Sequence, residues 1–403
     1  MQDNTSSLPR LRLKKSEDKR LRAGHLWIYS NEVDTHVTPL KQLTAGQCVT
    51  IENAQGRPMA SAYVNPNSLI CARIYTRQAD RILDQELIAQ RLQQALAWRS
   101  RCFDKPFYRL CFGESDFLPG VVIDRYGEYC VVQLTTAGAE SCKQQINQAL
   151  QALLSPAGIV LRNDTGAREL EALPNYTEVI HGSVPDEILI EENHTGFYAL
   201  PMSGQKTGWF YDHRNNRKLL QEYARDKRVL DVFSYSGAWG IAALNAGASQ
   251  ATFVDASAAA LEYVKQHAQL NGFTDRVATE KGDAFEELTK LQQAGMRFDI
   301  VVVDPPAFVK RRKDLAAGLR AYHEINRLAL SLLNPDGLLV SASCSYHVSA
   351  DELLNEVRKA ALHTQWDMQV IAQGHQAPDH PIHPAMPETR YIKAFFCRVL
   401  TRA

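Results

Sequence analysis

The chain has 403 residues, with 45 Lys or Arg against 45 Asp or Glu, so its formal net charge is zero. Hydrophobic residues make up 45% and charged residues 22%, which is typical of a soluble globular protein and excludes the disordered, collagen-like and coiled-coil classes. No apolar run approaches the roughly 18 residues of a membrane span, and the N-terminus lacks the apolar core of a secretory signal. The eight cysteines form no C-x-x-C pair, so we expect a cytoplasmic protein without a membrane partner.

Three domains are predicted in chain order. Residues 1–78 alternate short β-like runs with turn residues and predict a small β-barrel. Residues 79–185 predict a central α+β domain that opens with a helix over 83–100. Residues 186–403 alternate strands with helices, which predicts a doubly wound α/β sheet of parallel strands. The clearest strands of this last domain are 228–233, 252–255, 298–304, 337–343 and 391–399.

Basic residues gather in three places. Residues 8–24 hold seven Lys or Arg against two acidic residues, and residues 310–313 read KRRK. The third group comprises Lys206, Arg214, Arg217 and Lys218. In a neutral protein this segregation favours surfaces that contact nucleic-acid phosphates, and solvated faces are the alternative.

A strand, a loop of small residues and a helix are predicted in RVLDVFSYSGAWGIAAL. Gly237 and Gly240 allow a ligand to approach the backbone where doubly wound sheets bind cofactors. The loop lacks the G-x-G-x-x-G of dinucleotide folds, which disfavours a dinucleotide oxidoreductase. Asp231, directly after the strand, would repel a pyrophosphate but could pair with an ammonium group.

Two further aspartates stand at successive strand ends. Asp255 is placed where a carboxylate binds ribose hydroxyls, and Asp283 could accept a hydrogen bond from an adenine amino group. With Asp231 they describe an acidic pocket for a cationic nucleoside, which indicates S-adenosylmethionine (SAM) as the cofactor. The alternative is that these aspartates only cap helices.

Two more strand ends supply candidate reacting groups. FDIVVVDPPAFVK places Asp304 at the end of one strand, and GLLVSASCSYHV places Cys344 at the end of the next. Pro305 and Pro306 stiffen the loop, so its carbonyls and the Phe308 ring could present a flat base. Because ligands bind outside the carboxyl ends of parallel strands, Asp304 and Cys344 should face one crevice.

This pair suits methylation at C5 of a pyrimidine, a carbon that is a poor nucleophile. A thiolate that adds to C6 makes C5 enamine-like, so that C5 can attack a sulfonium methyl group, while a carboxyl at N3 stabilises the adduct. Cys344 and Asp304 are therefore the predicted catalytic residues. His347 or a helix beginning near Ser349 would favour the thiolate. The alternative for Cys344 is a small buried side chain.

The motifs DVFSYSGAWG, DPPAF and SCSYH, in that order and spacing, resemble the bacterial ribosomal RNA large subunit methyltransferase I family. The likeness extends over nearly the whole chain, from LRLKKSEDKRLRAGHLWIYSNEV to the tail PETRYIKAFFCRV. It implies a SAM-dependent cytosine-C5 methyltransferase acting on 23S rRNA or a large-subunit precursor. It further implies an N-terminal RNA-binding PUA domain, a Rossmann-like methyltransferase domain and a homodimer.

The motifs and the resemblance together assign two sets of contacts. The cofactor would be bound by Phe210, Tyr211, Asp212, Arg214, Asp231, Phe233, Ser234, Tyr235, Ser236, Gly237, Asp255, Asp283, Asp304 and Pro305. The RNA would be bound by Pro306, Phe308, Lys310, Arg311 and Arg312. By the resemblance, the stretch at 210–214 would close over the cofactor.

The chain departs from the family pattern in ways that affect its chemistry. His213 stands where Gln is usual, and the D-P-P loop has no second Cys, so no residue is assigned to remove the C5 proton. The alternative functions are an RNA N-methyltransferase that uses DPPAF without a thiol, and a non-catalytic RNA-binding or ribosome-assembly protein. No metal is expected, because His380 and His383 have no matching Cys or His ligands.

Overall fold

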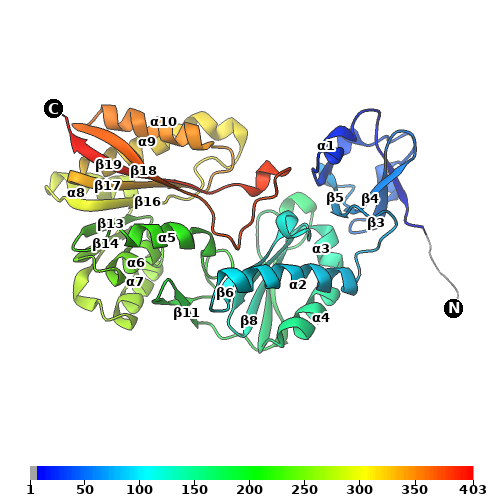
Figure 1. Cartoon of the computed structure of the whole chain (residues 1–403), viewed down its shortest axis with the longest axis horizontal. Helices are drawn as coiled ribbons and strands as arrows, with labels where there is room; N and C mark the ends of the chain where they lie inside the picture. Colours follow the sequence, from blue (N-terminus) through cyan, green and yellow to red (C-terminus); the bar gives the residue numbers. More distant parts are fainter. Residues whose placement is uncertain (1–6, 403) are drawn as a thin grey trace. The chain divides into compact units, whose positions relative to one another are not determined.

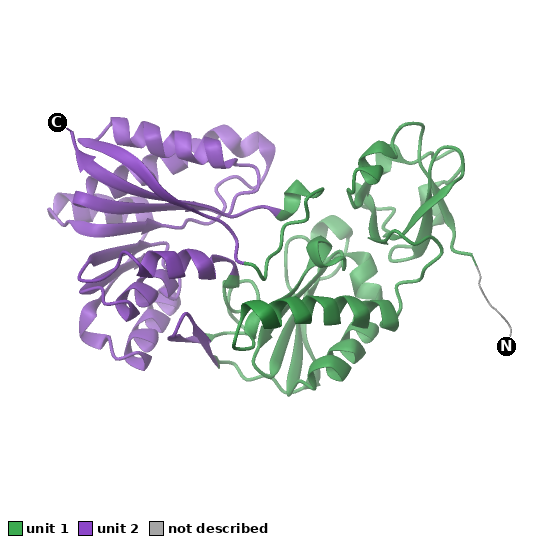
Figure 2. Cartoon of the chain, viewed as in Figure 1, with its two compact units in different colours: residues 1–188, 199–211, 378–389 green, residues 189–198, 212–377, 390–403 purple. Residues whose placement is uncertain are grey.

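The computed structural model describes residues 7–402 of the chain. Residues 1–6 and residue 403 lie outside the described residues. The predicted first domain and the stretch expected to lack a secretory signal both begin in residues 1–6. The chain divides into two compact units, drawn in green and purple in Figure 2. The first comprises Met1–Ile188, Ala199–Tyr211 and Pro378–Thr389, and the second comprises Leu189–Tyr198, Asp212–Ala377 and Arg390–Ala403.

The first unit begins with a five-stranded sheet of order β1-β3-β4-β5-β2. Its strands are β1 (Arg10–Arg12), β2 (Trp27–Tyr29), β3 (Cys48–Glu52), β4 (Pro58–Val64) and β5 (Ile70–Thr76), and its short helices are α1 (Lys19–Arg22), η1 (Ser30–Glu32) and η2 (Leu40–Gln42). β1 and β3 pair in parallel, whereas the other neighbours are antiparallel. Fully buried side chains such as Leu11, Ile51 and Ala62 form the core of this sheet. The predicted β-rich start of the chain is confirmed.

A second five-stranded sheet in the same unit has the order β10-β9-β8-β7-β6. Its strands are β6 (Phe107–Phe112), β7 (Val121–Tyr126), β8 (Tyr129–Leu134), β9 (Gly158–Asn163) and β10 (Tyr176–Gly182), and the helices are α2 (Gln85–Cys102), α3 (Ala137–Ser141), α4 (Lys143–Leu154), η3 (Gly113–Asp116) and η4 (Glu169–Glu171). The Asp84 carboxylate accepts a hydrogen bond from Leu87 N and so caps α2. Leu87, Ile88 and Leu92 on that helix are buried against the sheet, which confirms the helix predicted there.

The second unit is built on a seven-stranded sheet of order β15-β14-β13-β16-β17-β19-β18. Its strands are β13 (Arg228–Val232), β14 (Gln250–Asp255), β15 (Val277–Lys281), β16 (Phe298–Val303), β17 (Leu333–Ser343), β18 (Trp366–Gly374) and β19 (Lys393–Thr401); a separate pair is formed by β11 (Ile188–Glu192) and β12 (Thr195–Ala199). The five strands from β13 to β17 are parallel.

The predicted doubly wound sheet of parallel strands is confirmed from β13 to β17, but the sheet is antiparallel at one edge. β19 pairs antiparallel with both β17 and β18, and the sequence patterns did not predict β18. A parallel connection needs a crossover, usually a helix. Residues 375–392, all of them described, contain only η8 (Pro387–Thr389) and no α-helix, so the chain reverses direction between the last two strands.

Helices cover both faces of this sheet. They are α5 (Arg214–Gln221), α6 (Ala238–Asn245), α7 (Ala258–Leu270), α8 (Ala284–Gln293), α9 (Leu315–Ser331) and α10 (Ala350–Leu362), with η5 (Tyr211–His213), η6 (Thr274–Arg276) and η7 (Arg312–Asp314) between them. In Figure 1, α9 and α10 lie on one side of the sheet and α6 and α7 on the other. Because β13 to β17 are parallel, the loops that follow them all open at one edge, where cofactors bind in such sheets.

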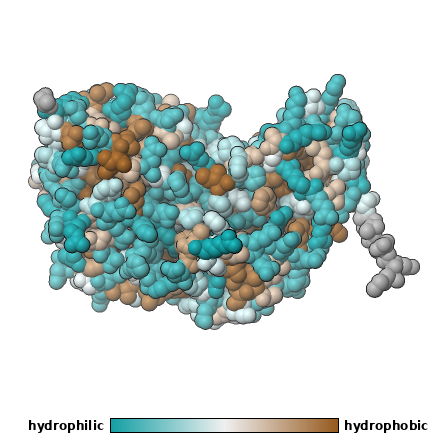
Figure 3. Space-filling view, in the orientation of Figure 1, coloured by the Kyte–Doolittle hydropathy of each residue, from teal (hydrophilic) through white to brown (hydrophobic). Residues whose placement is uncertain are grey.

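Hydrophilic residues dominate the face of the molecule in Figure 3, and apolar residues occupy small separate areas. No helix within residues 7–402 is both long and apolar enough to cross a bilayer. In that same part of the chain, no group of three or more His, Cys, Asp or Glu side chains is arranged to hold a metal ion.

Candidate active site

The loop between β13 and α6 has an unusual backbone conformation, and one of its residues must be glycine. Phe233, Tyr235 and Gly237 adopt left-handed conformations, with φ of 60°, 48° and 81°. A Cβ on Gly237 would lie 2.9 Å from the side chains of Phe253 and Val264, so only glycine fits there. The Tyr235 amide donates a hydrogen bond to Asp255 Oδ2 at 2.8 Å, which ties the loop to the end of β14.

Asp231 lies within β13 rather than after it and is fully buried. Its Oδ2 accepts a hydrogen bond from Gly240 N at 2.9 Å, while its Oδ1 has no hydrogen-bond partner among the described residues. Burial raises the pKa of this carboxyl to about 8, and the nearby charges of Asp304 and Asp255 add to the rise. A buried carboxyl with an open acceptor atom, beside two further carboxylates, fits a cationic ligand.

Asp255 and Asp283 cap the structure around the loop. Asp255, at the end of β14, accepts hydrogen bonds from Tyr235 N and from Ser257 N, both at 2.8 Å. Asp283 caps α8, because its Oδ1 accepts from the amides of Phe285 and Glu286. Each carboxylate can accept about four hydrogen bonds, so capping leaves room for a ligand hydroxyl or amino group.

Asp304, directly after β16, is held by two aromatic side chains that the sequence patterns did not single out as its partners. The Trp239 indole donates to Asp304 Oδ2 at 3.0 Å, and His213 Nε2 lies 3.5 Å from Oδ1. His213 Nδ1 lies 3.0 Å from the Asn216 side-chain amide, an N–H donor. The proton of a neutral His213 therefore sits on Nε2 and faces the carboxylate. The only sequence signal for Trp239 is its place in the first turn of α6.

Cys344 follows the last residue of β17 and is half-buried. Its Sγ lies 3.9 Å from the carbonyl oxygen of Pro305, so the loops after β16 and β17 meet as predicted. The predicted helix near Ser349 is confirmed, because the Ser349 and Glu352 side chains cap α10 reciprocally. The His347 ring packs against Tyr346, with 5.1 Å between their centroids.

Lys393 interacts electrostatically with Cys344, and the sequence motifs did not indicate it. It is the first residue of β19 and pairs with Ser343 of β17, and its Nζ donates a hydrogen bond to Ser345 O at 2.5 Å. Burial lowers the pKa of Lys393 to about 8, while the charge of Cys344 acts in the opposite direction. The sequence signal for Lys393 is that it is a single charged residue directly before the apolar run AFFC.

Residues proposed to contact the base and the RNA differ in exposure. Pro306 is exposed, as are Lys310, Arg311 and Arg312, the last of which starts η7. Phe308 packs against the aromatic rings of three neighbours, namely Tyr322 at 4.9 Å, Phe233 at 6.1 Å and Phe285 at 6.3 Å between centroids. Its ring is therefore held in place by core packing.

The stretch at 210–214 is divided between the two units. In the first unit, Tyr211 is buried and donates a hydrogen bond to Arg125 O at 3.1 Å, and Lys206 Nζ lies 4.2 Å from the Phe210 ring centroid. In the second unit, Asp212 Oδ2 accepts a hydrogen bond from the Tyr391 hydroxyl at 2.6 Å.

One basic group does not form the phosphate-contacting surface that its charge favoured, because two of its arginines are buried. Arg214 and Arg217 are both buried, and both point to Glu192 of β11, with N–O distances of 3.4 and 2.6 Å. A guanidinium in the interior needs a carboxylate partner, and Glu192 lies too far back in the sequence for the pairing to be predicted. These two arginines therefore support the fold of the second unit.

Comparisons with known proteins agree with this architecture. The sequence profile of a family described as S-adenosylmethionine-dependent methyltransferase matches residues 175–386, and that of a PUA-like domain matches residues 11–77. Ribosomal RNA large subunit methyltransferase I of Klebsiella pneumoniae (strain 342) is 38% identical over 400 residues, which are 98% of this chain and 99% of the relative. The protein of the same name from Yersinia pestis bv. Antiqua (strain Angola) is 38% identical over 397 residues, covering 97% and 99%.

Two solved structures share the fold. A methyltransferase complexed with SAH has a TM-score of 0.84 at 20% identity, and a SAM-dependent methyltransferase from Streptococcus mutans has a TM-score of 0.82 at 20% identity. Each alignment covers 97% of this chain and 100% of the other. With matches to a SAM-dependent methyltransferase family and a PUA-like domain, and with relatives 38% identical over nearly the whole chain, this protein uses SAM and belongs to the ribosomal RNA large subunit methyltransferase I family.

Proposed function

We propose that the protein methylates C5 of a cytosine in 23S rRNA through a covalent bond between Cys344 and C6 of the base. The observation that carries the proposal is that the Cys344 thiol lies 3.9 Å from Pro305 O, in the loop of Asp304, whose carboxylate is near the buried Asp231. The rRNA substrate follows from the names of relatives that align over nearly the full chain.

The two residues divide the chemistry. The Cys344 thiolate would add to C6 and displace the electron pair of the C5–C6 double bond onto C5 and the ring. C5 would then bond to the methyl group, while the electron pair of the broken methyl–sulfonium bond stays on the cofactor's sulfur. Loss of the C5 proton to solvent and departure of the thiolate would restore the double bond. The Asp304 carboxyl stabilises the adduct at N3. Trp239 and His213 hold that carboxyl in one orientation and so reduce the cost of placing it against the base.

The cofactor is held, in this proposal, by the loop 233–237 and by carboxylates at three strand ends. Asp231 faces its positive charge, Asp255 and Asp283 accept from its hydroxyl and amino groups, and Pro305 flanks it. The fit rests on the buried, partly unpaired and hard-to-ionise Asp231, since a cation relieves the cost of its charge.

The RNA would be bound by the β-rich N-terminal domain and by the exposed Lys310, Arg311 and Arg312 beside the D-P-P loop. The target base must leave its stack to reach Cys344. Pro306 and Phe308 would line the path of the target base. Residues 79–185 would form the domain that lies, along the sequence, between the N-terminal and the methyltransferase domain. We further propose that the protein is a cytoplasmic homodimer. Light scattering of the purified protein tests whether its mass is twice that of one chain.

Nucleoside mass spectrometry tests the reaction. Large-subunit rRNA lacking the modification is incubated with SAM and with either the unsubstituted protein or Cys344→Ser, and its nucleosides are separated. We expect 5-methylcytosine with the first and none with the second. Another methylated nucleoside, such as an N-methylated base, formed equally by both proteins, would contradict the proposal and support amino-group methylation without a thiol.

A further inference from the structure

Lys393 is a charged residue at the start of an otherwise apolar strand. β19 reads KAFFCRVLT, and only 8% of the Lys393 surface is exposed. Lysine is rarely buried to this extent without a partner that repays its desolvation. The strand register places Lys393 opposite Ser343, and its Nζ donates a hydrogen bond to Ser345 O, so its two contacts are the residues on either side of Cys344.

The groups that face Lys393 come from three elements. The Cys344 sulfur lies in the loop after β17, Glu352 lies on α10, and Arg390 precedes β19. The Glu352 carboxylate accepts hydrogen bonds from Ser349 N and Oγ, at 2.7 and 2.8 Å, and so belongs to the cap of α10. Of these three groups, Cys344 has the largest electrostatic effect on Lys393.

We propose that the Lys393 ammonium holds Cys344 as a thiolate, and so acts as a positioning residue for the nucleophile. The inference rests on the proposed function of Cys344. In this step the S–H bond breaks, the proton passes to water, the electron pair stays on sulfur, and Lys393 keeps its three protons. The same charge makes the thiolate a better leaving group when the adduct breaks down.

Electrostatic coupling between the two groups supports the assignment. The charged form of Cys344 raises the pKa of Lys393, against the larger effect of burial and the smaller opposing effect of Arg390. Coupling between two sites is reciprocal. An ammonium at Lys393 must therefore favour the charged form of the Cys344 thiol by the same free energy. Arg and Lys can both supply this charge, whereas Met cannot.

The test is the pH dependence of alkylation at Cys344, read by mass spectrometry of its peptide after treatment with iodoacetamide. Relative to the unsubstituted protein, Lys393→Met should move the midpoint upward by about one pH unit, which slows the reaction about tenfold at neutral pH. Lys393→Arg should keep the original midpoint. Lys393→Gln keeps a donor for Ser345 O and should behave like the Met variant, which separates loss of charge from loss of the hydrogen bond.

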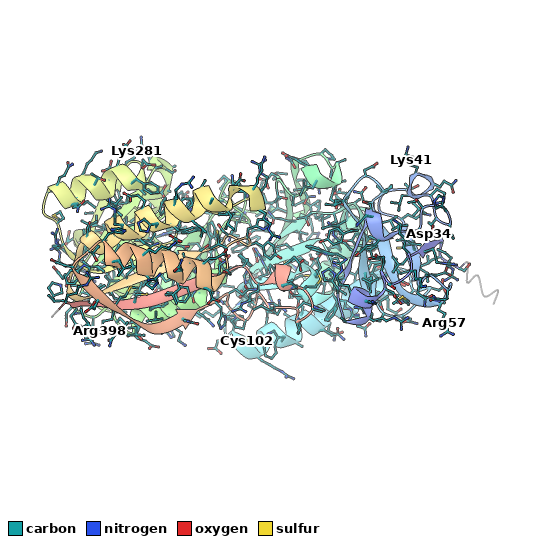
Figure 4. The ribbon with its side chains drawn as sticks, turned by 90° about the horizontal axis from the view of Figure 1, so that it is seen from above. Asp34, Lys41, Arg57, Cys102, Lys281 and Arg398 are labelled. Carbon is teal, nitrogen blue, oxygen red and sulfur yellow. The ribbon has the colours of Figure 1, made fainter. Side chains whose placement is uncertain are left out.

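Two controls guard against a general disturbance. Lys359→Met removes an exposed lysine that pairs with Glu356 on α10 and should leave the midpoint unchanged. Cys102, at the end of α2 and labelled in Figure 4, is a reference within each sample. An unchanged Cys344 midpoint in Lys393→Met, or an equal shift in Lys359→Met, would overturn the inference.

Failure of the inference can be told from failure of the proposed function. The alkylation assay uses neither RNA nor cofactor, so an unchanged midpoint would leave cytosine-C5 methylation standing. Conversely, 5-methylcytosine formed at an undiminished rate by Cys344→Ser would remove the reaction role of Cys344, whatever the alkylation profile shows.

Discussion

Cys344 and Cys397 lie on neighbouring strands of one sheet but have opposite environments. Cys397, in the middle of β19, pairs with Leu339 and is fully buried, and burial raises its pKa to about 12. Cys344, one residue past the end of β17, is half-buried beside the Pro305 carbonyl and the strand that starts with Lys393. The position along a strand, rather than the residue type, decides which thiol can become a nucleophile.

Alanine at each of the two cysteines should give opposite results. Cys344→Ala should slow single-turnover methyl transfer by at least about 10³-fold, because no other group can form the adduct, and should leave the melting temperature nearly unchanged. Cys397→Ala should keep the rate but lower the free energy of unfolding by about 1 kcal/mol, since it leaves a small cavity. Equal rates in the two variants would contradict the distinction between them.

The same comparison can be made between two carboxylates of β16, since Asp299 lies near its start and Asp304 follows its end. Asp304→Asn should lower the rate at saturating SAM by about 10²-fold, because the amide stabilises the adduct less well. Asp299 near the start of the strand accepts from Arg228 N and from the Asn334 side chain, so it only joins strands. Asp299→Asn should lower thermal stability and leave the rate intact. A tenfold slower rate in Asp299→Asn would show that position along the strand is not decisive.

Asp231 should make SAM binding depend on pH. Its folded-state pKa of about 8, against an ordinary value of 3.8, means that the carboxyl is mostly protonated at pH 7. A bound cation favours the ionised form, so binding should release a proton, and affinity should rise from pH 6 to about pH 8 and then level off. Calorimetry in buffers of different ionisation enthalpy measures the released proton.

Substitutions distinguish the effect of Asp231 on SAM binding from that of the exposed Asp283. Asp231→Asn should weaken SAM binding about tenfold at pH 8 and abolish the pH dependence. Asp283→Asn alters an exposed carboxylate that caps α8 and that we propose to bind the cofactor, so it should lower the affinity for SAM but retain the pH dependence. A pH profile that is unchanged in Asp231→Asn would rule out this carboxyl as the titrating group.

The smallest effect is expected on the exposed basic loop. Lys310→Gln with Arg312→Gln should reduce RNA affinity a few-fold and lower the slope of log affinity against log salt by about 1.4, for two lost contacts to single-stranded RNA. Lys290→Gln, which removes an exposed lysine paired with Glu287 on α8, is the matched control. An unchanged slope in the double variant would remove this loop from the RNA surface.

The strand-end residues could be predicted because each depends on local patterns. A buried run such as FDIVVV followed by Asp304 shows where the strand stops, and the parallel order of β13 to β17 then gathers the ends. The partners of these residues depend on pairings distant in sequence. Trp239 reaches Asp304 across 65 residues, and Lys393 reaches Ser345 across 48. No periodicity or spacing encodes such contacts.

The errors have the same origin. Arg214 and Arg217 look like surface charges until Glu192, 25 residues before Arg217, is brought against them. The antiparallel edge escaped prediction because β18 is mostly exposed, with Trp366 as its one buried residue, and only its pairing with β19 makes it a strand of this sheet. Burial and long-range pairing are properties of the fold, so single-sequence patterns do not contain them.

Trapping with 5-fluorocytosine tests the central claim most directly. The protein and Cys344→Ala are each incubated with SAM and rRNA that contains 5-fluorocytosine, and the products are run on a denaturing gel. Fluorine at C5 blocks the proton loss that precedes release of the thiolate, so we expect a covalent protein–RNA band with the unsubstituted protein and none with Cys344→Ala. Absence of the band from both, with methyl transfer to ordinary RNA surviving in Cys344→Ala, would contradict the covalent mechanism and leave Cys344 as a packing residue.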